Sequence, residues 1–193
     1  MFLAQRPDQG PGSAVAMVVE GTRPLLVEVQ ALVSRSYLTS PRRTTTGIDH
    51  NRACMLLAVL EKRAGLRLSD RDVFINVAGG LKVLEPALDL AVAVAVTSSF
   101  RERPVSHEVA LTGEVGLAGE VRSVNQLDRR LREAHRMGFG RAIIPGPAAA
   151  GSDLVGLETV MVKDIHSAVA AALSDSAPGA AGEPSPFDAE DES

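Results

Sequence analysis

FINVAGGLKVLEPALDLAVAVAVTSSF, residues 74–100, and HEVALTGEVGLAGEVRSVNQLD, residues 107–128, are the two stretches of sequence that decide the fold of this chain. They include two short apolar runs, residues 73–78 and 109–112, which are typical of buried strands. Residues 87–99 form an almost continuous apolar helix, and a helix that is apolar on all sides has to be buried. The two stretches therefore predict an α/β core.

The flanking segments supply further strands and helices. Strands are predicted at residues 13–20, 25–34, 141–145 and 157–162, and helices after Asp49, after Ser123 and after Asp164. Ser123 and Gln126 match a capping box at the start of the second of these helices. The polar residues 37–47 are predicted to form a loop. Because strands and helices alternate in the second half of the chain, the pattern predicts βαβ units.

Composition divides the chain into three parts. Residues 1–12 are rich in Pro and Gly and are predicted to be a linker, residues 13–173 a single domain, and residues 174–193 a disordered acidic tail. The tail has six acidic and no basic residues, so the rest of the chain has 20 basic and 18 acidic residues. No charge-free apolar run is long enough to span a membrane, and no secretory signal is visible, so we expect a cytoplasmic protein.

Common cofactor and metal motifs are missing from the sequence. It contains no phosphate-binding P-loop, and the pair Gly79-Gly80 lacks the third glycine of a dinucleotide-binding fingerprint. The single cysteine, Cys54, excludes an internal disulfide and a Cys-rich zinc site. The four histidines are dispersed, without the spacing of metal ligands. We therefore expect neither cofactor nor metal in this chain.

The segment LTGEVGLAGEV, residues 111–121, resembles a run of the proteolytic domain of Lon proteases. The likeness continues through Ala134-His135, Gly138 and the strand that ends at Pro145. It implies a Lon proteolytic-domain-like fold of the α/β (α+β) class, with βαβ units in two layers and a mixed sheet. The Lon family cleaves peptide bonds with a Ser–Lys dyad, in which the lysine takes the proton of the serine hydroxyl.

Both members of that dyad are replaced in this sequence. The resemblance places Ala87 at the position of the serine and Asp128 at the position of the lysine. A methyl group cannot attack an amide, and a carboxylate reverses the local charge. A rearranged peptidase that pairs Ser98 or Ser99 with Lys82 is conceivable, but no spacing supports it. We therefore expect a pseudo-protease.

A narrower resemblance points to the RadA (Sms) family of bacterial DNA-repair proteins, which are paralogues of RecA. The matching runs are PRR at residues 41–43, GIDHNR at 47–52, MLLAVLEKR at 55–63, NVAGGL at 76–81 and EPALDLA at 85–91. Members of that family also carry a Cys₄ zinc module and a RecA-like, DNA-dependent ATPase. The resemblance therefore places Zn, ATP and Mg in modules that this chain lacks, and implies that the chain is the C-terminal domain of a longer protein.

The RadA resemblance implies that this domain binds DNA and forms a homo-hexameric ring that supports branch migration. The DNA would be duplex or single-stranded, and contact with the recombinase RecA would be made through the full-length protein. An arginine-rich surface suits this role because it can neutralise phosphates. The candidate contacts are Arg42, Arg43, Arg52, Lys82, Arg129, Arg130 and Arg132.

Two observations keep an alternative to DNA contact open. Arg52 could instead pair with Asp49, and the arginines of residues 129–136 interleave with acids as on a solvated helix face. Arg42 and Arg43 have no obvious acid nearby and are the preferred candidates. A purely structural oligomerisation module is therefore the alternative to a DNA-binding domain.

Overall fold

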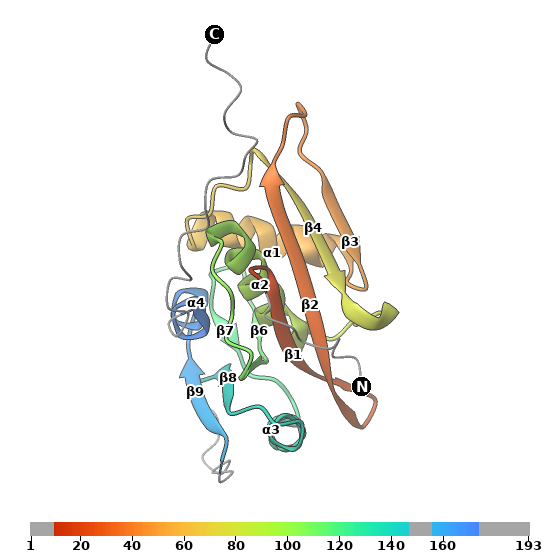
Figure 1. Ribbon diagram of the computed structural model, residues 1–193, viewed down its shortest axis with the longest axis vertical. Coiled ribbons are helices and arrows are strands. Elements are labelled where there is room, and N and C mark those ends of the chain that lie inside the picture. Colours follow the sequence, from red (N-terminus) through yellow and green to blue (C-terminus); the bar gives the residue numbers. More distant parts are fainter. Residues whose placement is uncertain (1–9, 147–155, 174–193) are drawn as a thin grey trace.

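The computed structural model describes residues 10–146 and 156–173 (Figure 1). The elements in chain order are β1 (Ser13–Glu20), β2 (Arg23–Arg35), β3 (Arg43–Thr46), α1 (His50–Arg63), β4 (Arg71–Val77), the 3₁₀ turns η1 (Ala78–Gly80) and η2 (Pro86–Leu88), α2 (Asp89–Arg101), β5 (Val109–Leu111), β6 (Glu114–Val115), β7 (Val121–Arg122), α3 (Leu127–Arg136), β8 (Arg141–Pro145), β9 (Glu158–Val162) and α4 (Ile165–Leu173).

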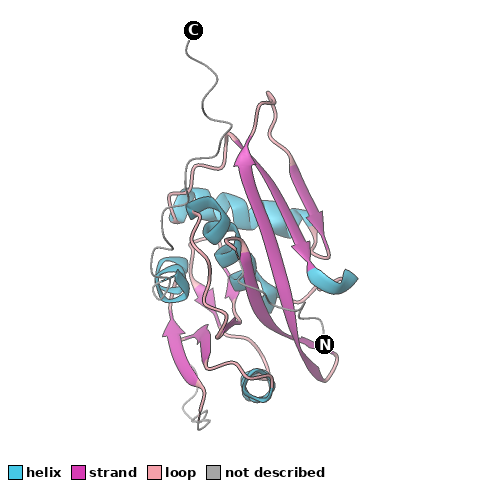
Figure 2. Cartoon of the chain, in the orientation of Figure 1, coloured by secondary structure: helices cyan, strands magenta, loops and turns pink. Residues whose placement is uncertain are grey.

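Seven strands form one mixed sheet in the order β3-β4-β2-β1-β5-β8-β9 (Figure 2). The pairs β1–β2 and β2–β4 are antiparallel, and the four other pairs are parallel. The strands β6 and β7 form a separate hairpin. This mixed sheet confirms the expected fold class.

One face of the sheet is covered by α1, α2 and α4, and α2 is the centre of that layer. Every residue from Asp89 to Ser99 is buried, as the apolar sequence of this helix predicts. The hydroxyl of Thr97 donates to the Ala93 carbonyl at 2.8 Å, which satisfies a polar group inside the core. The predicted buried helix is thus confirmed.

The opposite face of the sheet carries α3. Leu131 and Ala134 of this helix pack against Val15 and Met17 of β1 in a second, smaller core cluster. In Figure 1, α3 lies at the lower end of the molecule, away from α1. The helix therefore adds a partial third layer, and its outer side is free to face solvent.

Two local predictions are wrong. Residues 37–47 are not all loop, because Arg43–Thr46 form β3, which pairs in parallel with β4. The Ser123 capping box is not formed, since α3 begins at Leu127 and Gln126 lies before it in the left-handed region, with φ 57° and ψ 35°. The predicted caps of α1 and α4 are confirmed: Asp49 accepts from the Arg52 N–H, and Asp164 accepts from the Ser167 N–H.

Among the described residues, no helix is long and apolar enough to cross a membrane. The predicted acidic tail, residues 174–193, and most of the predicted linker lie outside the described residues. The domain boundaries stay predictions.

Candidate nucleic-acid interface and the replaced catalytic positions

Ala87, at the position of the family's serine, lies in the turn η2 and is 1% exposed. Its carbonyl accepts from the Gly113 N–H at 3.2 Å, and the Gly113 carbonyl accepts from the Leu90 N–H at 3.1 Å. The backbone around Ala87 is therefore fixed against the turn that follows β5. The Ala87 side chain offers this site only a buried methyl group.

Beside Ala87, Glu85 and Arg130 form an ion pair. Both amino groups of the Arg130 guanidinium donate to the Glu85 carboxylate, although the Arg130 side chain is 1% exposed. Arg130 also donates to the Met17 carbonyl at 2.8 Å and to the Asn125 carbonyl at 2.9 Å. Glu85 accepts in addition from the Val19 N–H at 2.6 Å. One buried arginine thus ties together β1, the segment before α2 and the start of α3.

Arg130 therefore has to be removed from the predicted DNA contacts. Its guanidinium is buried, and its donors are used by protein acceptors. The prediction that it lies on a solvated helix face is also wrong. Its partner Glu85 lies 45 residues away in the chain, so a helical pattern around residue 130 gives no sign of the pair.

Arg52 forms a second ion pair, with the buried Asp89. Two guanidinium nitrogens of Arg52 donate to the two Asp89 oxygens, and Asp89 also accepts from the Val115 N–H at 3.0 Å. Burial raises the pKa of the Asp89 carboxyl, and the hydrogen bond from Arg52 opposes this rise. The Arg52 guanidinium is thus directed at α2, and only its backbone N–H contacts Asp49.

Asp128, at the position of the family's lysine, is exposed in the first turn of α3. The geometry gives no support to a rearranged dyad. The Ser98 hydroxyl donates to the Arg103 carbonyl at 2.6 Å, and the Ser99 hydroxyl accepts from the Val33 N–H at 2.9 Å. Lys82 is exposed and lines a pocket to which neither serine contributes.

Arg43 and Arg42 make different contacts. The Arg43 guanidinium donates to the carbonyls of Leu68 and Arg71, so it connects β3 to the turn before β4. Arg42 is exposed, and its backbone N–H donates to the Asp72 carboxylate at 2.6 Å, which lowers the pKa of Asp72. The prediction that no acid lies near these arginines is wrong, because β4 brings Asp72 beside them.

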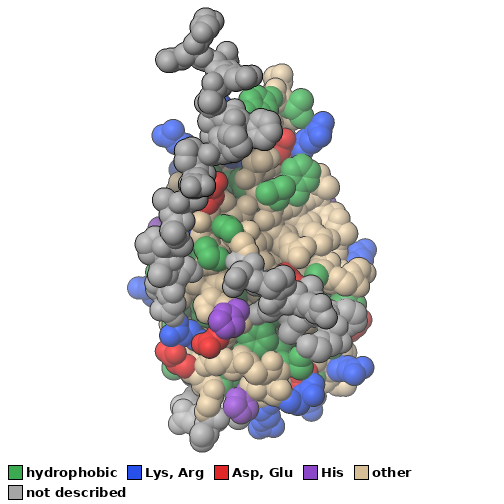
Figure 3. Space-filling model, in the orientation of Figure 1, with side chains coloured by type: hydrophobic (Ala, Val, Ile, Leu, Met, Phe, Trp, Pro, Cys, Tyr) green, Lys and Arg blue, Asp and Glu red, His purple; other side chains and the backbone are tan. Residues whose placement is uncertain are grey.

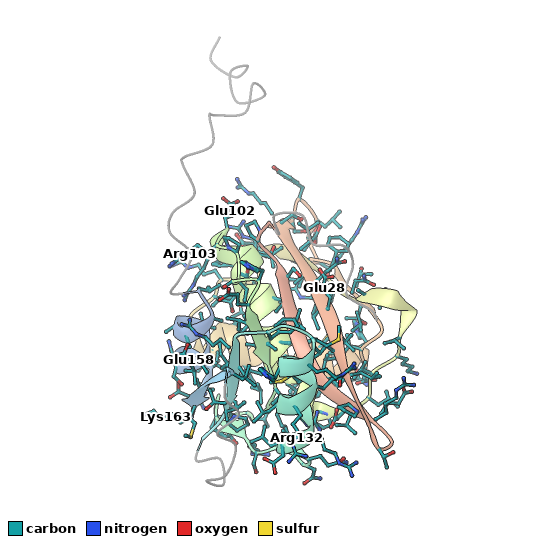
Figure 4. The ribbon with its side chains drawn as sticks, turned by 60° about the horizontal axis from the view of Figure 1, so that its bottom comes forward. Glu28, Glu102, Arg103, Arg132, Glu158 and Lys163 are labelled. Atoms are coloured by element: carbon teal, nitrogen blue, oxygen red, sulfur yellow. The ribbon has the colours of Figure 1, made fainter. Side chains whose placement is uncertain are left out.

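The outer side of α3 and the tip of the β1–β2 hairpin together form a surface that we call the α3 basic surface. It consists of Arg23, Arg129, Arg132 and Arg136, all of them exposed. Figure 4, in which the bottom of the molecule comes forward, labels Arg132 beside α3. Arg129 donates to the Thr22 carbonyl at 3.3 Å, which links the helix to the hairpin.

The four arginines of this surface are not equivalent. Arg136 pairs with Glu133, and Arg23 lies close enough to Glu133 to help lower the pKa of its carboxyl. Within the described parts of the chain, neither Arg129 nor Arg132 forms an ion pair. These two arginines therefore keep their guanidinium charge available to an anion from solvent.

Residues 61–175 match the family model of the C-terminal proteolytic domain of Lon protease, which is more than half of the chain. This chain belongs to the Lon C-terminal domain family. It is also similar to proteins named DNA repair protein RadA: 48% identical over 173 residues to one from Synechocystis, 50% over 169 residues to one from Pseudomonas aeruginosa, and 45% over 174 residues to one from Bacillus subtilis. These alignments cover 90%, 88% and 90% of this chain.

The same alignments cover 34%, 37% and 38% of those relatives, so the chain spans little more than a third of their length. Both expected resemblances, to Lon and to RadA, are confirmed. The Glu85–Arg130 pair lies beside Ala87, to which the resemblance assigns the position of the Lon serine. Arg23, which sequence reasoning did not find, joins the α3 basic surface only because the β1–β2 hairpin folds beside α3.

Proposed function

We propose that this chain is a non-proteolytic Lon-family domain that serves DNA repair by binding DNA phosphates and by assembling into a ring. The similarity to RadA proteins supports the DNA-repair role. The α3 basic surface is the observation that carries the DNA-binding part. Zn, ATP, Mg and contacts to a recombinase are assigned to segments outside this chain.

We propose fewer DNA-contacting residues than the sequence predicted. Arg42, Lys82, Arg129 and Arg132 have exposed side chains, and in the described residues none of these side chains forms an ion pair within 4 Å, although Asp72 holds the Arg42 backbone N–H. Arg43, Arg52 and Arg130 hold the fold together instead. Among the described Phe and Tyr side chains only Tyr37 is exposed, so we propose contact to the phosphate backbone without base reading.

The loss of peptidase activity is the second part of the proposal. Hydrolysis of an amide needs a nucleophile and a base within hydrogen-bond reach of each other. The buried methyl of Ala87 supplies no nucleophile, and the exposed carboxylate of Asp128 is not the amine base of a Ser–Lys dyad. The Glu85–Arg130 pair instead occupies the polar centre of this region.

A DNA-binding titration tests the proposal directly. Wild-type protein is compared with the double variant Arg129→Ala/Arg132→Ala and with a control of equal charge change, Arg67→Ala/Arg101→Ala, at two exposed arginines outside the α3 basic surface. We expect the α3 variant to bind duplex DNA more weakly than the control. Equal affinity of the two variants would remove the α3 basic surface from DNA binding, and no affinity in wild type would leave a purely structural module.

A further inference from the structure

The loop that follows β2 carries two apolar side chains into solvent. Tyr37 is 89% exposed and Leu38 is 48% exposed. The Arg35 guanidinium lies 5.9 Å from the centre of the Tyr37 ring, and the Leu38 N–H donates to the Ser36 hydroxyl at 3.2 Å. These contacts order a small apolar projection, which we call the β2 knob. In Figure 3, hydrophobic side chains gather at the upper end of the molecule, where β2 ends.

At the other end of β2, the β1–β2 hairpin and the segment before η2 enclose an apolar pocket. Its volume is about 260 Å³. Val18, Val19, Leu25, Leu81 and Val83 line it. Leu84, which is 72% exposed, lies at its rim. We call this feature the hairpin pocket. An exposed apolar surface with this concave shape is typical of a site that receives a side chain.

The β2 knob cannot reach the hairpin pocket of its own molecule. The thirteen residues of β2 separate the two features, and a strand rises about 3.3 Å per residue, so they lie roughly 40 Å apart. Figure 1 shows the two ends of β2 at opposite ends of the molecule. A knob of one copy can therefore enter only the pocket of another copy. Such a contact is head-to-tail, and repeated contacts of this kind close into a ring or form a filament.

The charges around the two features are complementary. Glu20 and Glu85 border the hairpin pocket, while Arg35 and Arg42 flank the β2 knob. Glu85 is held by Arg130, and the backbone N–H of Arg42 is held by Asp72. Glu20 at the pocket and Arg35 at the knob are then exposed opposite charges. Lys82 at the pocket and Asp70, whose carbonyl accepts from the Ser36 N–H beside the knob, form a second opposite pair, and Arg23 faces Glu20 across the hairpin. Opposite charges at the rim favour a single orientation of docking.

We propose that the β2 knob of one copy of this chain inserts into the hairpin pocket of a second copy. This contact would be the repeated interface of the ring, and it rests on the assembly part of the proposed function. It leaves Arg129, Arg132 and Arg136 of the α3 basic surface open, since none of them lines the pocket or flanks the knob, whereas Arg23 stands opposite the pocket residue Glu20. Assembly and DNA binding can therefore be tested separately.

Sedimentation velocity across a protein-concentration series tests this interface. The knob variant is Tyr37→Ser/Leu38→Ser, the pocket variant is Leu84→Asp, and the control is Leu117→Asp, at a leucine that is 69% exposed on the β6–β7 hairpin. We expect wild type and control to associate alike and each interface variant to associate at least about tenfold more weakly, as for the loss of an interface anchor. Far-UV circular dichroism shows that each variant is folded.

A mixture of the two interface variants gives the sharpest result. The knob variant still has a pocket and the pocket variant still has a knob, so an equimolar mixture should form a dimer and nothing larger. A charge exchange gives a second test: Glu20→Arg and Arg35→Glu should each weaken association, and the two changes in one chain should restore it.

Three outcomes would overturn the interface: unchanged association of both interface variants, a mixture that stays monomeric, or a wild-type chain that is monomeric at every concentration. None of these outcomes bears on DNA binding, which is decided by the titration with Arg129→Ala/Arg132→Ala.

Discussion

Arg130 and Glu85 form an ion pair in which the arginine is 1% exposed and the glutamate side chain is 25% exposed. The pair stands next to Ala87 and connects β1, the start of α3 and the segment before α2. The backbone around Ala87, where the resemblance to Lon proteases places the serine, is thus fixed by a structural ion pair.

Removal of the arginine tests this role. Arg130→Met should lower the free energy of unfolding by about 3–5 kcal/mol, because it leaves the Glu85 carboxylate without its countercharge and removes the hydrogen bonds from the guanidinium to the Met17 and Asn125 carbonyls. Arg132→Met, two positions away on the exposed side of α3, should stay within about 0.5 kcal/mol of wild type. Urea unfolding measures both. Equal stability of the two variants would show that the buried pair does not hold the segments together.

The α4 cap predicts a pH dependence. Hydrogen bonds from the Ser167 N–H and hydroxyl lower the pKa of Asp164 below its ordinary value of 3.8. Because the folded-state pKa is lowered, the stabilisation is fully present above pH 3.8 and is lost as the pH falls through the folded-state pKa. Asp164→Ala should cost about 1 kcal/mol near neutral pH, and this cost should shrink in acid.

Ser167→Ala removes the hydroxyl donor and should reproduce part of that pH-dependent cost. Urea unfolding of the three proteins between neutral pH and pH 3 provides the comparison. A cost of Asp164→Ala that is constant over this range would contradict the assignment of the cap.

The left-handed backbone before α3 predicts a stabilising substitution. Gln126 has φ 57°, and Glu102 at the end of α2 has φ 51°. A side chain is strained in this region, so Gln126→Gly and Glu102→Gly should each raise the unfolding free energy by up to about 1 kcal/mol. Asn125→Gly, at a neighbour without a positive φ, should lower the unfolding free energy or leave it unchanged. A midpoint temperature of thermal unfolding that is higher for Asn125→Gly than for Gln126→Gly and Glu102→Gly would contradict the left-handed backbone at residues 126 and 102.

These residues also show how far sequence reasoning reaches. The strands β1 and β2, the helix α2 and the caps at Asp49 and Asp164 were predictable, because their signals are local. The strand β3 was not, since the polar run of threonines is indistinguishable from a loop until it pairs with β4, almost thirty residues later. The capping box is not formed because Gln126 lies in the left-handed region and α3 begins only at Leu127; the Arg130 guanidinium binds the Asn125 carbonyl at this start.

The candidate site was predictable only in part, because it too depends on contacts between segments that are distant in the chain. Arginines can be counted in a sequence, but their availability depends on partners from distant segments. Leu68, Asp89 and Glu85 hold Arg43, Arg52 and Arg130 within the fold. Arg23 could not be placed beside α3 before the hairpin was known. The replaced dyad positions, by contrast, followed from the resemblance to the Lon family alone.

The absence of a nucleophile at Ala87 predicts that the protein does not hydrolyse peptides. A serine-reactive probe should leave wild type unlabelled, and Ala87→Ser alone should not restore cleavage, because position 128 supplies no lysine. The double variant Ser98→Ala/Ser99→Ala tests the alternative of a rearranged peptidase that uses one of these serines. Casein cleavage that this double variant abolishes would contradict the proposal.

The salt dependence of duplex DNA binding decides whether the α3 basic surface contacts phosphates. The slope of log K against log salt falls by about 0.9 for each phosphate contact that is lost. We predict that Arg129→Ala/Arg132→Ala weakens binding and flattens the slope by about 0.9 per arginine, while Arg67→Ala/Arg101→Ala keeps the wild-type slope. Wild-type binding that does not respond to salt, or an α3 variant with the wild-type slope, would contradict it.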